Sequence, residues 1–266
     1  MRRKKSIAPL LLVPAIALGV IGAATSRQLG KKQAHVTTHG EWVTYARPGS
    51  KDSIRAYVAY PERKGKAPAV IVIHEIYGLT DWEPTVVDRL AANGYVAIVP
   101  DLLSSKHGRT PPNADSARKL IGELEPDRVT GDLDATYAWV AKQPATAADR
   151  IGVIGFCWGG GQTFRYATNN PKLRAAVVCY GPTPQEGLER IRAPILGVYG
   201  EDDARINQAL PETASRMKAA GKPFEQKTYP GTGHGFLKPG RKGNDGPQPD
   251  KAWNDILAFY RQQLGK

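Results

Sequence analysis

The sequence predicts an α/β fold in which a mostly parallel central sheet is flanked by helices. From Gly40 onward, short apolar segments alternate with longer segments of helical character. Apolar runs without polar alternation are typical of parallel strands, because helices cover both faces of such a sheet. A single domain is expected, since a chain of 266 residues suits one large α/β core.

The predicted elements follow one another in a regular order. Residues 43–45 and 54–60 are expected to form an antiparallel opening pair, because the second segment alternates apolar with polar or small residues. Further strands are predicted at 69–74, 96–99, 151–155, 175–179 and 195–199, with an edge strand at 224–229. Helices are predicted at 85–93, 115–123, 128–142, 160–168, 208–220 and 251–264. Residues 238–250 are dense in glycine, proline and charge, which indicates a surface loop.

The composition excludes two classes of protein. A hydrophobic content of 41% and a charged content of 23% are those of a globular chain rather than a disordered one. The net charge is +12, of which Arg2 to Lys5 supply four charges, and the remaining excess is spread along the chain. No nucleic-acid-binding motif accompanies this charge, so a nucleic-acid partner is not expected. Two cysteines, Cys157 and Cys179, do not suggest a disulfide framework.

The N-terminal segment has the organisation of an export signal. Arg2 to Lys5 form a basic region, and an apolar stretch from Ile7 to Ala24 follows it. The small residues Gly22, Ala23 and Ala24 offer a cleavage site before Thr25. The apolar stretch is also long enough to cross a bilayer as an uncleaved anchor.

This organisation divides the chain into three parts. Residues 1–26 are predicted to be a signal peptide or N-terminal anchor, residues 27–41 a linker, and residues 42–266 the folded domain. The domain is expected in the periplasm or otherwise outside the cytoplasm. Contact with the inner membrane is expected only through an uncleaved N-terminal segment, and the protein is expected to be a monomer.

Residues 154–161 carry the strongest functional signal. They read Ile-Gly-Phe-Cys-Trp-Gly-Gly-Gly, a small-x-nucleophile-x-small turn between a predicted strand and a predicted helix. This pattern is typical of a nucleophile elbow, with Cys157 at its apex and its sulfur at the helix N-terminus. The helix dipole is expected to favour a thiolate there. The alternative is a buried cysteine in an ordinary strand–helix turn.

An elbow of this kind predicts an acid after a later strand and a histidine after the last one. Residues 200–203 read Gly-Glu-Asp-Asp after a predicted strand, and Asp203 is the expected acid, with Asp202 as the alternative. His234 follows the predicted edge strand in a glycine-rich turn. A nucleophile, an acid and a base in this order at strand ends favour a catalytic triad.

Four segments resemble the dienelactone hydrolase family of α/β-hydrolases, over roughly Trp42 to Leu264. They are His-Glu-Ile-Tyr-Gly at 74–78, Pro-Asp-Leu at 100–102, Gly-Phe-Cys-Trp-Gly-Gly at 155–160, and the turns of Asp203 and His234. The resemblance implies the α/β-hydrolase fold and a Cys-His-Asp triad that hydrolyses small-molecule esters or lactones. It also implies that Glu75 holds the resting thiol and yields it to the histidine when substrate arrives. The alternative for Glu75 is a strand-end carboxylate that caps the next loop.

The expected chemistry needs no metal or organic cofactor. His234 would take the proton of Cys157, and Asp203 would orient the imidazole. The oxyanion of the intermediate would be bound by the backbone N–H groups of Trp158 and Ile76. A thioesterase, acyltransferase or peptidase could use the same triad, and an inactive anchored binding protein could keep the same fold.

The resemblance is weaker where the substrate would bind. Known members of the family bind a substrate carboxylate with two arginines, and the corresponding positions here fall at Lys238 and near Ala114, one helical turn before Arg118. Lysine pairs with a carboxylate as a point charge and not as a bidentate fork. Lys238 and Arg118 are therefore candidate substrate-binding residues, with surface charges as the alternative. Tyr77, Trp82 and Trp158 are expected to line an apolar acyl pocket, with a place in the core as the alternative.

Overall fold

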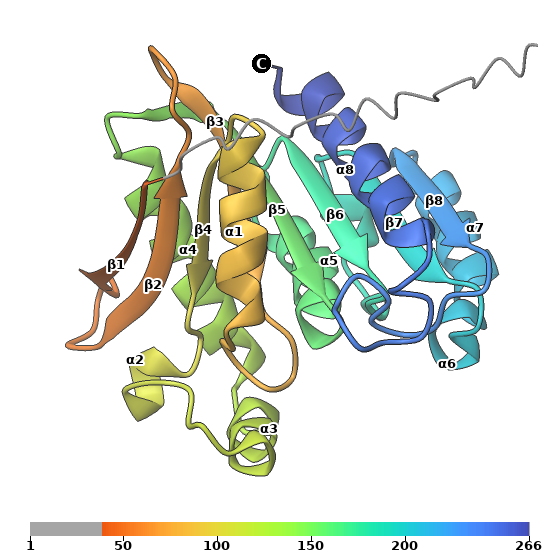
Figure 1. Ribbon diagram of the computed structural model, residues 1–266, viewed down its shortest axis with the longest axis horizontal. Helices are drawn as coiled ribbons and strands as arrows, with labels where there is room; N and C mark the ends of the chain where they lie inside the picture. The colour runs from red at the N-terminus through yellow and green to blue at the C-terminus, as the bar shows by residue number, and fades with distance from the viewer. Residues whose placement is uncertain (1–38, 266) are drawn as a thin grey trace, which may run out of the picture. The chain divides into compact units, whose positions relative to one another are not determined.

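Eight strands form one sheet in the computed structural model, which describes residues 39–265 (Figure 1). The strands are β1 (His39–Ala46), β2 (Ser53–Tyr60), β3 (Ala67–Ile73), β4 (Val96–Pro100), β5 (Thr146–Phe156), β6 (Ala175–Cys179), β7 (Ile195–Gly200) and β8 (Phe224–Tyr229). Their order across the sheet is β1-β2-β4-β3-β5-β6-β7-β8. The pairs β1–β2 and β2–β4 are antiparallel, and all later pairs are parallel. The predicted antiparallel opening and parallel remainder are both confirmed.

Helices cover both faces of this sheet. They are α1 (Trp82–Ala92), α2 (Ser104–His107), α3 (Ala114–Gly122), α4 (Pro126–Ala141), α5 (Trp158–Asn169), the 3₁₀ turn η1 (Leu188–Arg190), α6 (Ala204–Asn207), α7 (Leu210–Ala219) and α8 (Gln248–Leu264). Helices α1 and α8 pack on one face, and α4, α5 and α7 pack on the other (Figure 1). This two-sided cover is the reason that the central strands are apolar without alternation.

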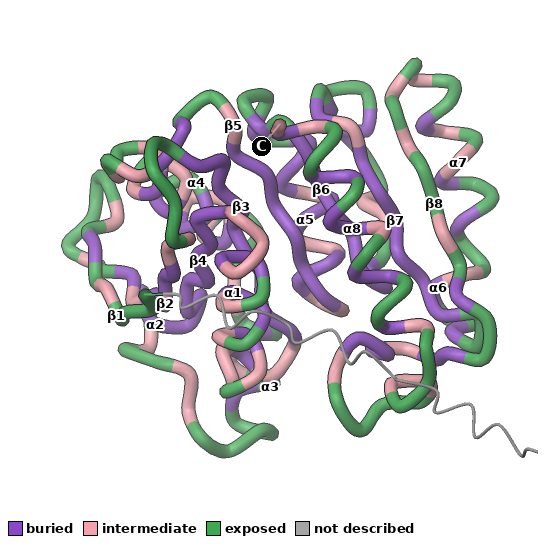
Figure 2. The backbone as a smooth tube through the Cα atoms, turned by 45° about the horizontal axis from the view of Figure 1, so that its top comes forward, coloured by how far each residue is buried: buried purple, intermediate pink, exposed green. Residues whose placement is uncertain are grey.

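Strand β3 shows how the core is divided between the two faces. All seven of its residues are buried. Ile71 and Ile73 pack with α4 and α5, whereas Val70 and Val72 pack with α1 and α8, because successive side chains of a strand point to opposite faces. Figure 2 shows the central strands buried along most of their length, with exposure concentrated in the outer helices and loops. Each such side chain contributes roughly 1.5–3 kcal/mol on burial.

The observed boundaries differ from the expected ones at the start of the domain. Strand β1 begins at His39, so the last residues of the predicted linker belong to the sheet. His39, Gly40 and Glu41 pair with the end of β2 through the backbone while their side chains remain exposed, and no apolar pattern marks them. The rest of the linker and the predicted leader, residues 1–26, lie outside the described residues.

Three short elements were not expected: α2, η1 and α6. Each has only three or four residues, too few to display an apolar period. Within residues 39–265, no helix is both long enough and apolar enough to span a bilayer. The carboxyl ends of β3, β5, β6 and β7 meet at one edge of the sheet, which is where α/β sheets of this kind bind ligands.

Candidate active site

Cys157 lies in a sharp turn between β5 and α5. Its backbone has φ 55° and ψ −116°, a conformation that residues other than glycine rarely adopt. A Cβ on Gly155 would overlap the carbonyl of Gly159, and a Cβ on Gly159 would overlap the carbonyl of His74. The glycines therefore allow α5 to start directly against the ends of β3 and β5. The strand–turn–helix geometry of a nucleophile elbow is present.

His234 and Asp203 form a hydrogen-bonded pair at the same edge of the sheet. The Nδ1 atom of His234 lies 2.5 Å from Oδ2 of Asp203, which is only 5% exposed. Asp202, the alternative acid, is exposed and pairs with Lys242 at 2.8 Å. Asp203 is thus the carboxylate that contacts the histidine. The ring of Tyr180 packs edge-on against the imidazole, with 5.1 Å between ring centroids.

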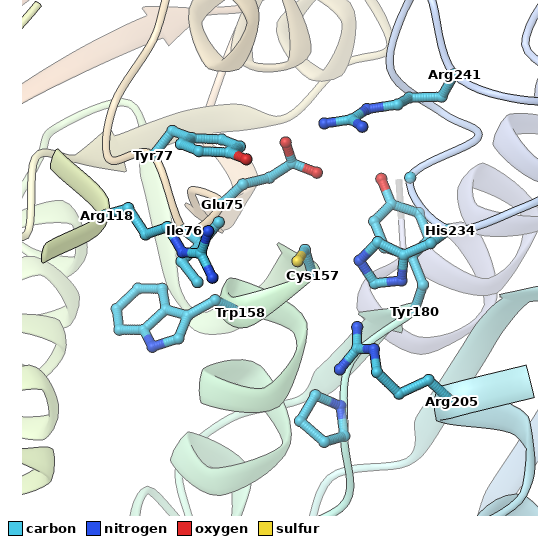
Figure 3. A pocket seen from close by; sticks show the side chains of 12 residues that line it. Glu75, Ile76, Tyr77, Arg118, Cys157, Trp158, Tyr180, Arg205, His234 and Arg241 are labelled. Carbon is cyan, nitrogen blue, oxygen red and sulfur yellow. The ribbon is translucent and has the colours of Figure 1, made fainter. Parts of the chain in front are cut away.

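The other ring nitrogen of His234 is buried and has no hydrogen-bond partner among the described residues. Because Nδ1 donates its proton to Asp203, the lone pair of Nε2 is free to accept one. His234 and Cys157 both line a cavity of about 550 Å³. Figure 3 shows Cys157 at the centre of this cavity, with His234 on one side and Trp158 on the other. The arrangement can move a proton from a thiol to an imidazole.

Burial has the largest effect on the resting state of Cys157. Burial raises the pKa of the thiol, and the negative charge of Glu75 raises it further. The backbone N–H of Trp158 and the charge of Arg205 lower it, but by less. The thiol is therefore protonated near neutral pH, because desolvation outweighs the groups at the helix N-terminus that favour a thiolate.

The two backbone N–H groups that were predicted to bind an oxyanion belong to Trp158 and Ile76, beside Cys157. Trp158 is the first residue of α5, so its N–H has no partner within the helix. The N–H of Ile76 donates to no backbone carbonyl in the described part of the chain. Both residues line the cavity beside Cys157 (Figure 3). The structure therefore brings the two predicted oxyanion donors to the same side of the elbow.

Glu75 and Lys238, which are far apart in the sequence, form an ion pair. Nζ of Lys238 lies 2.9 Å from Oε2 of Glu75, and the ammonium stands 5.1 Å from the ring centroid of Trp82. Glu75 lines the cavity, as expected, but no hydrogen bond joins it to Cys157 among the described residues. Lys238 does not line the cavity, and its charge is already compensated. The structure therefore does not favour the predicted contact of Lys238 with a substrate carboxylate.

Three arginines surround the mouth of the cavity: Arg118, Arg205 and Arg241 (Figure 3). Arg118 was predicted, whereas Arg205 in α6 and Arg241 in the loop before α8 were not. None of the three has an acidic partner within 4.0 Å among residues 39–265. Tyr77 and Trp158 line the cavity, whereas Trp82 is half-buried and packs against Phe156 instead. Within the same residues, no cluster of His, Cys, Asp and Glu side chains could hold a metal ion.

The strand order, the elbow after β5 and the histidine after β8 define the chain as an α/β-hydrolase. A family model described as the Dienelactone hydrolase family matches residues 54–264, and the chain belongs to that family. It is accordingly a hydrolase that acts on ester or lactone bonds of small molecules. The family resemblance and the α/β-hydrolase fold predicted from the sequence are both confirmed.

Individual relatives agree with this assignment. A Salmonella typhimurium protein provisionally named carboxymethylenebutenolidase is 34% identical over 82% of this chain and 86% of its own length. A Bradyrhizobium protein, provisionally named 2-oxo-3-(5-oxofuran-2-ylidene)propanoate lactonase, is 31% identical over 84% of this chain and 94% of its own. The crystal structure of a provisionally named dienelactone hydrolase from Klebsiella pneumoniae superposes with a TM-score of 0.76 at 29% identity, covering 85% of this chain and 99% of that one.

Proposed function

We propose that this protein is an exported ester or lactone hydrolase that uses Cys157, His234 and Asp203 for covalent catalysis. One observation carries the proposal. Nε2 of His234, which has no hydrogen-bond partner within residues 39–265, is buried beside the cavity that Cys157 lines, while Nδ1 is held by Asp203. Buried polar atoms are normally hydrogen-bonded, so an unpartnered base next to a thiol is best explained by a proton that it receives during the reaction.

The reaction proceeds in two halves. In the first, Nε2 of His234 takes the proton of Cys157, and the sulfur bonds to the ester carbonyl carbon. The resulting oxyanion accepts hydrogen bonds from the N–H groups of Trp158 and Ile76, and it collapses to a thioester as the alcohol leaves with the proton from His234. In the second, His234 deprotonates a water that attacks the thioester, and the acid and free thiol are released.

The raised pKa of the thiol suits this order of events. A protonated resting thiol is a weak nucleophile, so Cys157 would become reactive only when an ester occupies the cavity and the proton moves to His234. The carboxylate of Asp203 then stabilises the imidazolium. Glu75, held by Lys238, would keep the thiol protonated between turnovers through its negative charge.

We further propose that the substrates are anionic. Arg118, Arg205 and Arg241 line the cavity and have no acidic partner in the described part of the chain, so a substrate carboxylate would supply one. Guanidinium groups bind carboxylates in a bidentate geometry that a lysine cannot offer. The name of the Bradyrhizobium relative describes a lactonase whose substrate carries both a lactone ring and an anionic propanoate group.

The N-terminal segment supports the proposed export. Arg2 to Lys5 and the apolar stretch from Ile7 to Ala24 have the order of a signal peptide. A reporter enzyme fused after Gly40 should be active only outside the cytoplasm of a bacterial host. Loss of residues 1–24 from the mature chain would identify a cleaved signal, and their retention in the membrane fraction would identify an anchor. A full-length chain found soluble in the cytoplasm would contradict export.

The catalytic proposal is tested with a panel of chromogenic short-chain esters, lactones, thioesters and peptides. Cys157→Ala should abolish hydrolysis of the esters and lactones, because the nucleophile is lost. Cys179→Ala is the matched control, since Cys179 is fully buried in β6 and lies outside the cavity lining. That variant should keep most of the activity. Near-normal turnover by Cys157→Ala would refute the mechanism, and faster turnover of thioesters or peptides would favour those reaction classes instead.

A further inference from the structure

His74 is a fully buried histidine that does not itself line the cavity, yet it contacts two residues that do, Glu75 and Trp158. It follows β3, and both of its ring nitrogens are hydrogen-bonded to the backbone. Nδ1 lies 2.9 Å from the carbonyl oxygen of Glu75, and Nε2 lies 3.2 Å from the N–H nitrogen of Leu102. A backbone N–H can only donate and a carbonyl can only accept. The ring is therefore neutral, with its proton on Nδ1.

The contact with Glu75 fixes the orientation of one peptide group. The Glu75 carbonyl accepts hydrogen bonds from Nδ1 of His74 and from the N–H of Gly78, the latter at 3.1 Å. The peptide between Glu75 and Ile76 is planar and trans, so its carbonyl and its N–H point in opposite directions. When His74 holds the carbonyl, the N–H of Ile76 is turned away from His74.

The same histidine contacts the residue that supplies the other oxyanion donor. The rings of His74 and Trp158 are stacked, with centroids 5.6 Å apart and an angle of 15° between their planes. The carbonyl of His74 also approaches the backbone of Gly159 so closely that no Cβ fits there. The first turn of α5 is thus packed against His74 through a side chain and through the backbone.

We propose that His74 is a positioning residue for the oxyanion hole. It holds the Glu75–Ile76 peptide with its N–H toward the cavity, and it fixes the start of α5 alongside, so both donors are in place before substrate binds. Preorganised donors stabilise a transition state without reorganisation, which is the basis of oxyanion-hole catalysis. The inference rests on the covalent mechanism proposed above, but His74 itself touches no reacting atom.

Two substitutions separate the positioning contact from general packing. His74→Asn keeps an amide donor near the position of Nδ1 and loses the acceptor for Leu102. His74→Gln keeps an acceptor near the position of Nε2 and loses the donor to the Glu75 carbonyl. For ester hydrolysis, His74→Gln should lower kcat by about 10²-fold with little change in KM, as expected when a donor of the oxyanion hole is misplaced. His74→Asn should retain kcat within about 10-fold of wild type.

The rate at which iodoacetamide alkylates Cys157 distinguishes a misplaced oxyanion donor from a general loss of structure, because only a loss of structure should change this rate. This displacement forms no oxyanion, so both variants should alkylate at the wild-type rate while their hydrolysis rates differ. Equal kcat losses in the two variants, or a fall in alkylation that matches the fall in kcat, would overturn the inference. If the wild-type enzyme shows no hydrolysis that depends on Cys157, the proposed function fails instead.

A measurement on the unmodified protein does not depend on how the variants fold. Nitrogen-15 NMR of the histidine rings should show His74 in the neutral form with the proton on Nδ1. The Ile76 amide proton should shift downfield when an aldehyde forms a tetrahedral adduct with Cys157. A proton on Nε2 of His74, or an Ile76 amide that does not respond to the adduct, would also overturn the proposal.

Discussion

Asp132 and Asp203 are buried carboxylates that both receive hydrogen bonds from basic side chains, and they differ in what lies beyond those partners. Asp132 in α4 accepts from Nε of Arg47 at 2.7 Å and from the hydroxyl of Ser105 at 2.5 Å. Asp203 accepts from Nδ1 of His234 at 2.5 Å. Asp132 is fully buried and Asp203 is 5% exposed. Burial and charge pairing alone therefore do not distinguish a structural pair from a candidate catalytic one.

The difference lies in the next atom along each network. Beyond Ser105 comes Arg128, which also binds Asp52 at 2.9 Å, so the Asp132 network continues from one polar partner to the next. It connects the turn after β1 with α2 and α4. Beyond Asp203, by contrast, the network ends at Nε2 of His234, which has no partner among the described residues and belongs to a cavity-lining side chain. A network with all members bonded stabilises a fold, whereas one that ends in an open acceptor can take up a proton.

The largest expected effect comes from breaking the Asp203–His234 pair, which should leave the fold intact. Asp203→Asn should lower kcat/KM for ester hydrolysis by roughly 10³- to 10⁴-fold, because the amide no longer holds His234 in the tautomer that leaves Nε2 free. Thermal unfolding should change little. Steady-state kinetics and a melting curve measure the two effects, and Asp202→Asn is the matched control with near-normal kinetics. Comparable losses in both variants would contradict the assignment of Asp203 as the acid that orients His234.

The structural pair should respond in the opposite way. Asp132→Ala should lower the free energy of unfolding by about 2–4 kcal/mol, because Arg47 and Ser105 lose a buried acceptor. Ester hydrolysis at a temperature well below the melting point should stay near normal. Urea unfolding measures the first quantity. Asp52→Ala, at the more exposed end of the same network, should cost no more than about 1 kcal/mol. A large kinetic defect in Asp132→Ala would remove the distinction between the two networks.

The sequence was most informative where local pattern and chain order determine structure. The buried strands are short apolar runs, and the glycines around Cys157 are required by close backbone contacts. Asp203 and His234 were predictable from their order after the elbow. Strand β1 was predicted too short, because its first residues are exposed and are held by backbone pairing alone.

The rest of the site depends on contacts between distant segments. Lys238 pairs with Glu75 across 163 positions of the chain, and no local pattern encodes that contact. Arg205 and Arg241 reach the cavity from a short helix and an irregular loop, whose paths a sequence pattern does not reveal. The protonated state of Cys157 also depends on burial, which the helix N-terminus alone could not predict.

A third prediction tests the charge at the mouth of the cavity. Replacing Arg118 and Arg241 together with Gln should lower kcat/KM for an anionic lactone by about 10- to 100-fold, as for the loss of charged hydrogen bonds. A neutral ester of similar size should be nearly unaffected. Arg174→Gln is the matched control, since Arg174 is exposed next to the start of β6, at the opposite edge of the sheet. Equal losses on both substrates would point to a structural role for the two arginines.

The smallest expected effect concerns a third carboxylate, Glu75, which combines features of the other two. It is paired like Asp132, but it also lies close enough to Cys157 for its charge to raise the pKa of the thiol. A negative charge favours the protonated thiol, so Glu75→Gln should lower that pKa and increase the thiolate fraction at neutral pH. Alkylation of Cys157 by iodoacetamide at pH 7 should therefore accelerate by about 3- to 10-fold.

The pH dependence gives the sign of this effect directly. In the wild-type protein the alkylation rate should rise with pH and reach its midpoint above the ordinary thiol range, because burial and Glu75 both raise the pKa of Cys157. In Glu75→Gln the whole curve should shift to lower pH, and in the exposed control Glu186→Gln it should not move. An unchanged or higher midpoint in Glu75→Gln would mean that the Lys238 ammonium already cancels the charge of Glu75. Glu75 would then be structural, like Asp132, and burial alone would keep the resting thiol protonated.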